Sequence, residues 1–170
     1  MDFQAALGLT EPDAIDSPTE ALDIFREEYG TRAVGFLVSL GIPRRTAQYY
    51  YAGRSIRQPE RRALLVDYAR DIQRQHIEGD RRKVADKIRR ASSTYCPRVE
   101  VTSASSGDDE GGRSPGWQPL YALDRAGIAE LVQTGEFEPA DTMYSDAIME
   151  AYGAGGALDI ASYDGPIQWR

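Results

Sequence analysis

Helix start and stop signals alternate along residues 17–92 and confine this part of the chain to a run of helices. The first signal is Ser17-Pro18-Thr19-Glu20, which has a serine N-cap, a proline at the first helical position and the glutamate of a capping box. Leu22, Phe25 and Tyr29 follow at helical spacing. The pattern predicts one amphipathic helix that begins at Ser17.

Two further helices are predicted on either side of a turn at Leu40-Gly41-Ile42. Thr31 is the expected N-cap of the first, and Gly41 suits the left-handed residue that closes it. Pro43 begins the second helix, which is expected to end near Ala52. The residues expected to face the core are Phe36, Leu40, Ile42, Ala47 and Tyr50, with Leu37 at a position where a small residue is usual. We interpret this pair as a helix-turn-helix, in which the small Ala47 makes room for Leu37.

The later segments give weaker signals. Another helix is expected from Pro59, with a break or a new cap at Gly79-Asp80 and a basic continuation to Arg90. Beyond it we expect a short strand over Pro97–Thr102, a flexible linker over Ser103–Gly116, an extended Trp117–Leu123, helices over 124–134 and 141–152, and a hairpin at Asp164-Gly165. The predicted fold class is mainly α (α+β), with an N-terminal helix-turn-helix domain and a small C-terminal strand-helix-helix and hairpin region. The expected divisions are an acidic arm (1–16), a DNA-binding helical domain (17–92), a short strand and Gly/Ser/Asp linker (93–116) and an acidic dimerisation or partner region (117–170).

Charge is divided among three blocks. Residues 1–30 hold eight acids and one base, 31–98 hold sixteen bases and six acids, and 99–170 hold thirteen acids and three bases. The net charges are −7, +10 and −10, so the overall −7 conceals a basic middle segment. A concentrated basic segment is the electrostatic footprint of a phosphate-binding protein. The alternative is a soluble acidic protein whose bases lie on solvated helix faces.

Outward residues of the second helix of the pair are the candidates for reading DNA. Arginine matches guanine and glutamine matches adenine at base edges in the major groove. We therefore assign Arg44, Arg45, Gln48 and Tyr49 to the groove, Thr31, Arg32, Arg54 and Arg57 to phosphates, and Arg81, Arg82 and Lys83 to non-specific backbone contacts. The alternative is a solvated helix of an ordinary bundle, with the bases paired to acids of the same chain.

Several classes of function are disfavoured by residue usage. Cys96 and His76 are the only residues of their types, so an internal disulfide and a structural zinc site are not expected. We expect no cofactor and no enzymatic activity. No apolar run reaches the ~20 residues of a membrane span, and no secretion signal is recognised, so we expect a cytoplasmic protein that contacts no membrane.

The chain resembles the telomere terminal proteins of linear actinobacterial replicons. The resemblance rests on Thr31–Val34, Leu40-Gly41-Ile42, Arg45-Thr46 and Tyr50. It implies binding to replicon ends, and a side-chain hydroxyl that becomes joined to DNA and primes a polymerase. The matching segment offers Thr94, Thr102, Ser103, Ser105 and Ser106, and the sequence selects none of them. It also implies that residues 118–152 are similar to a ribbon-helix-helix, a dimerising unit.

These observations predict a sequence-specific protein that binds double-stranded DNA and forms a homodimer. A role in replication or maintenance of replicon ends, with a DNA polymerase or other replication protein as partner, is the first interpretation. The alternatives are a plasmid or viral transcription or partition regulator, and an acidic adaptor that binds no DNA. The acidic C-terminal third is assigned to self-association or to a partner protein. Its apolar contacts would be Ile128, Leu131, Val132, Tyr144, Ile148 and Trp169, unless these residues form the protein's own core.

Overall fold

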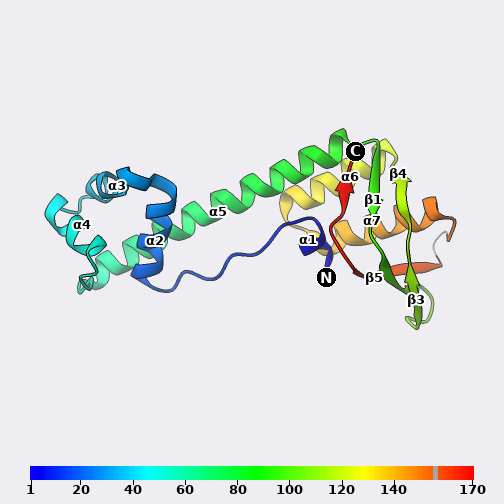
Figure 1. Cartoon of the computed structure of the whole chain (residues 1–170), viewed down its shortest axis with the longest axis horizontal. Coiled ribbons are helices and arrows are strands. Elements are labelled where there is room, and N and C mark those ends of the chain that lie inside the picture. Colours follow the sequence, from blue (N-terminus) through cyan, green and yellow to red (C-terminus); the bar gives the residue numbers. More distant parts are fainter. Residues whose placement is uncertain (155–156) are drawn as a thin grey trace. The chain divides into compact units, whose positions relative to one another are not determined.

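The computed structural model has an α+β fold and describes residues 1–154 and 157–170 (Figure 1). The chain forms two compact units. We call Pro12–His76 the helical unit, and Met1–Glu11 with Ile77–Arg170 the mixed unit. The strands of the described residues all lie in the mixed unit. Within the same described residues, no helix is both long enough and apolar enough to cross a membrane.

The helical unit begins with the predicted capping box, which is confirmed. Helix α2 (Pro18–Tyr29) has Ser17 as its N-cap. The Glu20 backbone N–H donates to Ser17 Oγ at 3.2 Å, and the Ser17 N–H donates to Glu20 Oε2 at 2.9 Å. Hydrogen bonds from the backbone N–H groups of Asp16 and Ser17 lower the pKa of Glu20, because they favour its ionised form.

Two short helices follow α2, and a turn at Leu40–Ile42 joins them. They are α3 (Ala33–Ser39) and α4 (Arg44–Tyr51). The fully buried residues of the shared core include Phe25, Leu37, Ile42, Ala47 and Leu65. Tyr50 is also buried, as predicted, whereas Phe36 and Leu40 are half-buried and pack against this cluster. Leu37 is therefore accommodated in the same core as the small Ala47.

The predicted N-cap at Thr31 is wrong. Gly30–Arg32 form a single 3₁₀ turn, and α3 begins at Ala33 with Arg32 as its N-cap and no side-chain capping bond. Gly30 has a φ of +53°, so the backbone bends at the end of α2 and re-enters a tight turn at once. Thr31 lies inside that turn and is exposed.

The predicted break at Gly79-Asp80 is also wrong. Helix α5 runs without interruption from Pro59 to Arg90, and its residues up to His76 belong to the helical unit and the rest to the mixed unit. Glycine in a helix costs only about 1 kcal/mol relative to alanine. The flanking arginine, lysine, glutamine and alanine residues favour the helix, and Lys83 pairs with Asp80 one turn away at 2.9 Å.

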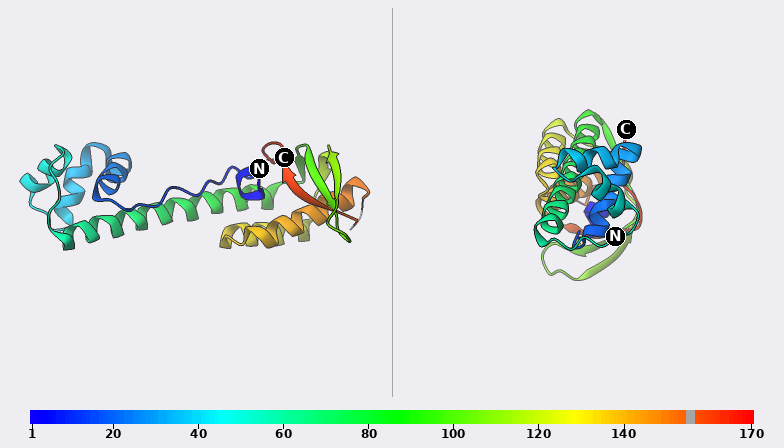
Figure 2. Two further views of the ribbon diagram at one scale, coloured as in Figure 1. Left: turned by 90° about the horizontal axis from the view of Figure 1, so that it is seen from below. Right: turned by 90° about the vertical axis from the view of Figure 1, so that its left-hand side faces the viewer.

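The mixed unit contains two three-stranded antiparallel sheets among its described residues. One has the order β4-β1-β6 and the other β3-β2-β5. The strands are β1 (Ser93–Cys96), β2 (Val99–Ser103), β3 (Asp109–Arg113), β4 (Gly116–Pro119), β5 (Leu158–Tyr163) and β6 (Gln168–Trp169). The helices of this unit are α1 (Phe3–Ala6), α6 (Ala122–Thr134), α7 (Phe137–Tyr152) and the second part of α5 (Figure 2).

The core of the mixed unit absorbs most of the apolar residues that we had considered for self-association. Ile128, Val132, Tyr144 and Ile148 are fully buried, and Leu131 and Trp169 pack against them. The intramolecular alternative is therefore confirmed for the four fully buried residues, whereas Leu131 and Trp169 are half-buried. The acidic arm expected at 1–16 divides, because α1 inserts Phe3 and Ala6 into this core while Pro12 onward belongs to the helical unit.

Three predictions in this unit need correction. The linker over 103–116 contains β3, which pairs with β2 although it is rich in glycine, because the partner strand supplies its hydrogen bonds. The hairpin at Asp164-Gly165 is wrong, since β5 pairs with β2 and β6 pairs with β1 in the other sheet. Helix α7 begins at Phe137, before Pro139. The first turn tolerates this proline because the N–H groups there have no acceptor within the helix, so the N–H that proline lacks is not missed.

A matched pair of glycine variants tests the continuity of α5. Gly79 is helical and an added Cβ would meet nothing within 4 Å, so Gly79→Ala should raise the free energy of unfolding by about 0.5–1 kcal/mol. Gly41 has a φ of +81°, so Gly41→Ala should lower it by about 1 kcal/mol. Thermal and urea unfolding followed by circular dichroism measures both. A loss of stability in Gly79→Ala would contradict a continuous helix.

Candidate nucleic-acid interface

The turn between α3 and α4 fixes which face of α4 is exposed. Gly41 adopts the left-handed conformation, its N–H donates to Val38 O at 3.0 Å, and the Ile42 N–H donates to Leu37 O at 3.2 Å. These two hydrogen bonds form a Schellman motif. The apolar contact that usually accompanies the motif is made by Leu37 and Ile42, which both lie in the core. The chain therefore enters α4 with one face already anchored.

On the opposite face of α4, three of the four predicted groove residues are exposed, and the fourth, Tyr49, is half-buried. Arg44, Arg45 and Gln48 are exposed, whereas Ala47 and Tyr50 on the inner face are buried. Pro43 is the N-cap and makes no side-chain capping bond. The first backbone N–H groups of a helix have no partner within it, so those of Arg44 and Arg45 add to the positive end of the helix dipole.

Tyr49 lies between two arginines. Arg45 Nε donates to Tyr49 Oη at 2.7 Å, and the Arg54 guanidinium lies 4.1 Å from the centre of the tyrosine ring. Arg54 reaches this position because Gly53, with a φ of +85°, closes α4 and the Arg54 N–H returns to Tyr49 O at 3.0 Å. The end of this helix near Ala52 was predicted from the sequence, but the stacking of Arg54 on Tyr49 was not.

Thr31, Arg32 and Arg44 come together around one hollow. Together with Val34, Gly35 and Val38 of α3 they line a depression of about 340 Å³. Residues predicted to contact phosphate and a residue predicted to contact bases are therefore neighbours.

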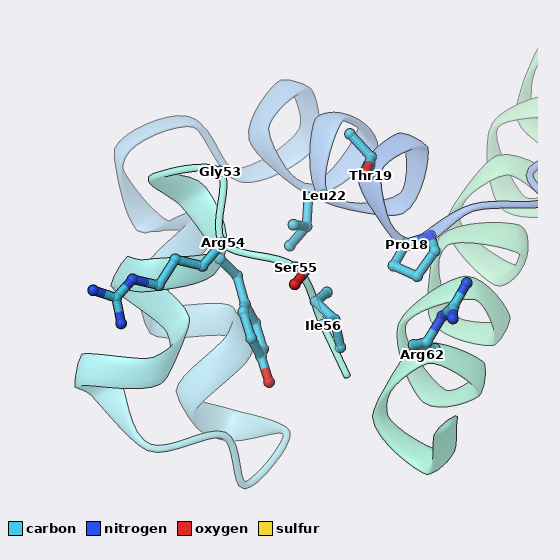
Figure 3. A pocket seen from close by; sticks show the side chains of 9 residues that line it. Pro18, Thr19, Leu22, Gly53, Arg54, Ser55, Ile56 and Arg62 are labelled. Atoms are coloured by element: carbon cyan, nitrogen blue, oxygen red, sulfur yellow. The ribbon is translucent and has the colours of Figure 1, made fainter. Parts of the chain in front are cut away.

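A second hollow of about 390 Å³ lies beside the loop that follows α4 (Figure 3). Its lining includes Pro18 and Leu22 of α2, Ser55 and Ile56 of the loop, and Arg62 of α5. The guanidinium of Arg54 extends away from it (Figure 3). Arg57, the remaining phosphate candidate, is exposed in the same loop.

Charge is unevenly paired within the helical unit. Residues 30–62 contain seven arginines and one acid, Glu60. None of these seven arginines forms an ion pair within the part of the chain that the structure describes. By contrast, Arg26, Arg70 and Arg74 of the same unit each pair with an aspartate at 3.0–3.2 Å. The unpaired arginines belong to the segment that carries α3 and α4.

The residues predicted to make non-specific contacts to the DNA backbone are Arg81, Arg82 and Lys83. They belong to the mixed unit, where two of them contact other side chains. The Arg81 guanidinium lies 5.2 Å from the centre of the Phe137 ring, and Lys83 pairs with Asp80. Arg82 is exposed. Of these three residues, only Arg82 has a side chain without a hydrogen bond, ion pair or ring contact in the described residues.

The hydroxyls considered for attachment to DNA differ in accessibility. Thr94 is fully buried; its hydroxyl donates to Gln168 O at 3.0 Å and lies 3.2 Å from Tyr144 Oη. Thr102 and Ser103 are half-buried on β2, and Ser105 and Ser106 are exposed in the turn after it. Thr94 is therefore part of the core of the mixed unit.

Buried polar groups next to Thr94 are structural in character. Burial raises the pKa of the Cys96 thiol to about 12, which a hydrogen bond to Tyr144 only partly offsets, so the thiol stays neutral. Tyr163 Oη donates to Asp141 Oδ1 at 2.5 Å, and burial raises the pKa of both groups.

In residues 1–154 and 157–170, no cluster of three metal-ligating side chains occurs. His76 is exposed and lies 2.9 Å from Glu28.

No family model, no curated protein and no solved structure matches this chain.

Replacing the hydroxyl of Thr94 tests its structural role. Thr94→Val should lower the free energy of unfolding by about 1–3 kcal/mol, because it leaves the buried Tyr144 hydroxyl and the part-buried Gln168 carbonyl with one hydrogen-bond partner fewer. Ser105→Ala, at an exposed position, should stay within about 0.5 kcal/mol of the parent. Urea unfolding measures both changes. Equal effects of the two substitutions would contradict the assignment of Thr94 to the core.

Proposed function

We propose that this protein binds double-stranded DNA in a sequence-specific manner, with α3 and α4 acting as a helix-turn-helix. In this proposal α4 lies in the major groove. Arg44, Arg45 and Gln48 contact base edges, and Tyr49 is held beside them by Arg45 and Arg54. The single observation that carries the proposal is the outward position of Arg44, Arg45 and Gln48 opposite a buried Ala47 and Tyr50, with neither arginine in an ion pair among the described residues.

Contacts to phosphate are assigned to residues that border α4. Thr31 and Arg32 share a hollow with Arg44, and Arg54 and Arg57 follow α4 directly. Each phosphate contact releases counterions, so the affinity should fall steeply with salt. Unpaired arginines suit this role, because no internal ion pair has to be broken before DNA binds.

The biological role that we propose is replication or maintenance of replicon ends, as the resemblance to telomere terminal proteins implies. Among the hydroxyls that the resemblance offers for covalent attachment to DNA, those of Ser105 and Ser106 belong to exposed residues. A plasmid or viral transcription or partition regulator is the alternative, and it requires the same DNA contacts with no covalent product. Neither role assigns a catalytic reaction to this chain. The protein is expected to be cytoplasmic and homodimeric in both.

A selection of genomic fragments by the full-length protein at two salt concentrations tests DNA binding and reveals the site. The double variant Arg44→Ala/Arg45→Ala should then lose its preference for the selected duplex over a random one, since each base contact contributes about 1–3 kcal/mol of discrimination. Fluorescence anisotropy measures both affinities. The variant Arg32→Ala/Arg57→Ala should weaken binding to both duplexes alike. It should also reduce the slope of log affinity against log salt concentration by about 0.9 per lost phosphate contact.

The matched control is Arg26→Ala/Arg74→Ala, which removes the same charge from arginines paired with aspartates in the same unit. It should keep the sequence preference of the parent protein. Absence of binding at low salt would instead support the adaptor that contacts no DNA. Unchanged selectivity in Arg44→Ala/Arg45→Ala would remove α4 from the proposed interface.

A further inference from the structure

An apolar groove lies between α6 and α7 of the mixed unit, with a volume of about 450 Å³. Leu131, Met143 and Ala147 line it, and Leu131 and Ala147 also pack against the core. Met143 closes over Gly127 of α6, where an added Cβ would lie 2.6 Å from the methionine sulfur. The missing side chain of Gly127 therefore leaves room for Met143 against α6.

Exposed apolar side chains are concentrated on the same two helices and the residue before α6. Tyr121 is 71% exposed, Leu123 87%, Met143 36% and Tyr152 43%. Of these four, Met143 lines the groove itself. Exposed apolar surface bordered by polar residues is typical of a protein-binding site.

The border of the groove is acidic and unpaired. Asp124, Asp146 and Glu150 contribute three carboxylates, and the lining contains no arginine, lysine or histidine. In the described residues none of the three carboxylates is in an ion pair. A polyanion such as DNA would be repelled here. A symmetric dimer through this face would place the same carboxylates opposite each other, because a two-fold interface pairs a patch with itself.

We infer that the α6–α7 groove is a docking site for a basic amphipathic helix of a partner protein. Apolar side chains of that helix, spaced one turn apart, would enter between Leu131, Met143 and Ala147. Its lysines or arginines would pair with the carboxylates at the border. This inference does not depend on DNA binding, because none of the residues that line the groove belongs to the proposed DNA interface.

The test uses the full-length protein and a fluorescent model peptide of about 18 residues, or five helical turns, with leucines on one face and lysines elsewhere. We expect saturable binding by anisotropy, and none by the counterpart with glutamate in place of lysine. Asp146→Lys/Glu150→Lys should weaken binding at least tenfold. Met143→Ala should weaken it several-fold, because it removes an apolar contact without changing charge.

The matched control is Asp108→Lys/Glu110→Lys, which makes the same charge change at exposed positions after β2 and within β3. It should bind within about threefold of the parent protein. Equal weakening in the two double variants would show non-specific attraction and overturn the inference, as would absence of binding. Sedimentation of the protein without peptide completes the test. A dimer that dissociates in Asp146→Lys/Glu150→Lys would show that a second copy of the chain occupies the groove, and would contradict the inference.

Discussion

The left-handed turn at Gly41 is the constraint on which the proposed interface depends. It closes α3, directs Ile42 into the core beside Leu37, and starts α4 with Ala47 and Tyr50 facing inward. Once that inner face is buried, the helical period leaves Arg44, Arg45 and Gln48 no direction but outward. The apolar core and the polar surface of α4 are therefore two consequences of one backbone conformation.

Ion pairs distinguish two kinds of charged surface on this protein: one on which the charges are neutralised by neighbours, and one on which they are not. Arginines of 30–62 are without ion pairs among the described residues, whereas Arg26, Arg70 and Arg74 are neutralised by aspartates. The carboxylates that border the α6–α7 groove are likewise unpaired. An exposed ion pair contributes little to stability, about 0–1 kcal/mol, so leaving these groups unpaired costs the fold little. Both surfaces therefore remain charged and available to the proposed partners.

Local signals in the sequence predicted the elements whose causes are local. The Ser17 capping box, the turn at Gly41, the stop at Gly53 and the helix ending before Gly135 all depend on residues within one or two turns. Exposure of Arg44, Arg45 and Gln48 was predictable from helical spacing for the same reason. The strand β3 was missed because its glycines hide the alternating pattern, although its partner β2 directly precedes it. The separation of β5 from β6 was missed because their partners β2 and β1 lie far away in the sequence. The continuity of α5 through Gly79 was missed because one glycine does not outweigh its helix-forming neighbours.

The most direct measurement is an NMR titration of the isotopically labelled full-length protein with its selected DNA duplex at moderate salt. The account predicts that amide shifts concentrate on residues 31–32 and 43–57, with α6 and α7 unaffected. Shifts confined to the mixed unit, or none while the duplex is bound, would contradict the assignment of α4 to the major groove.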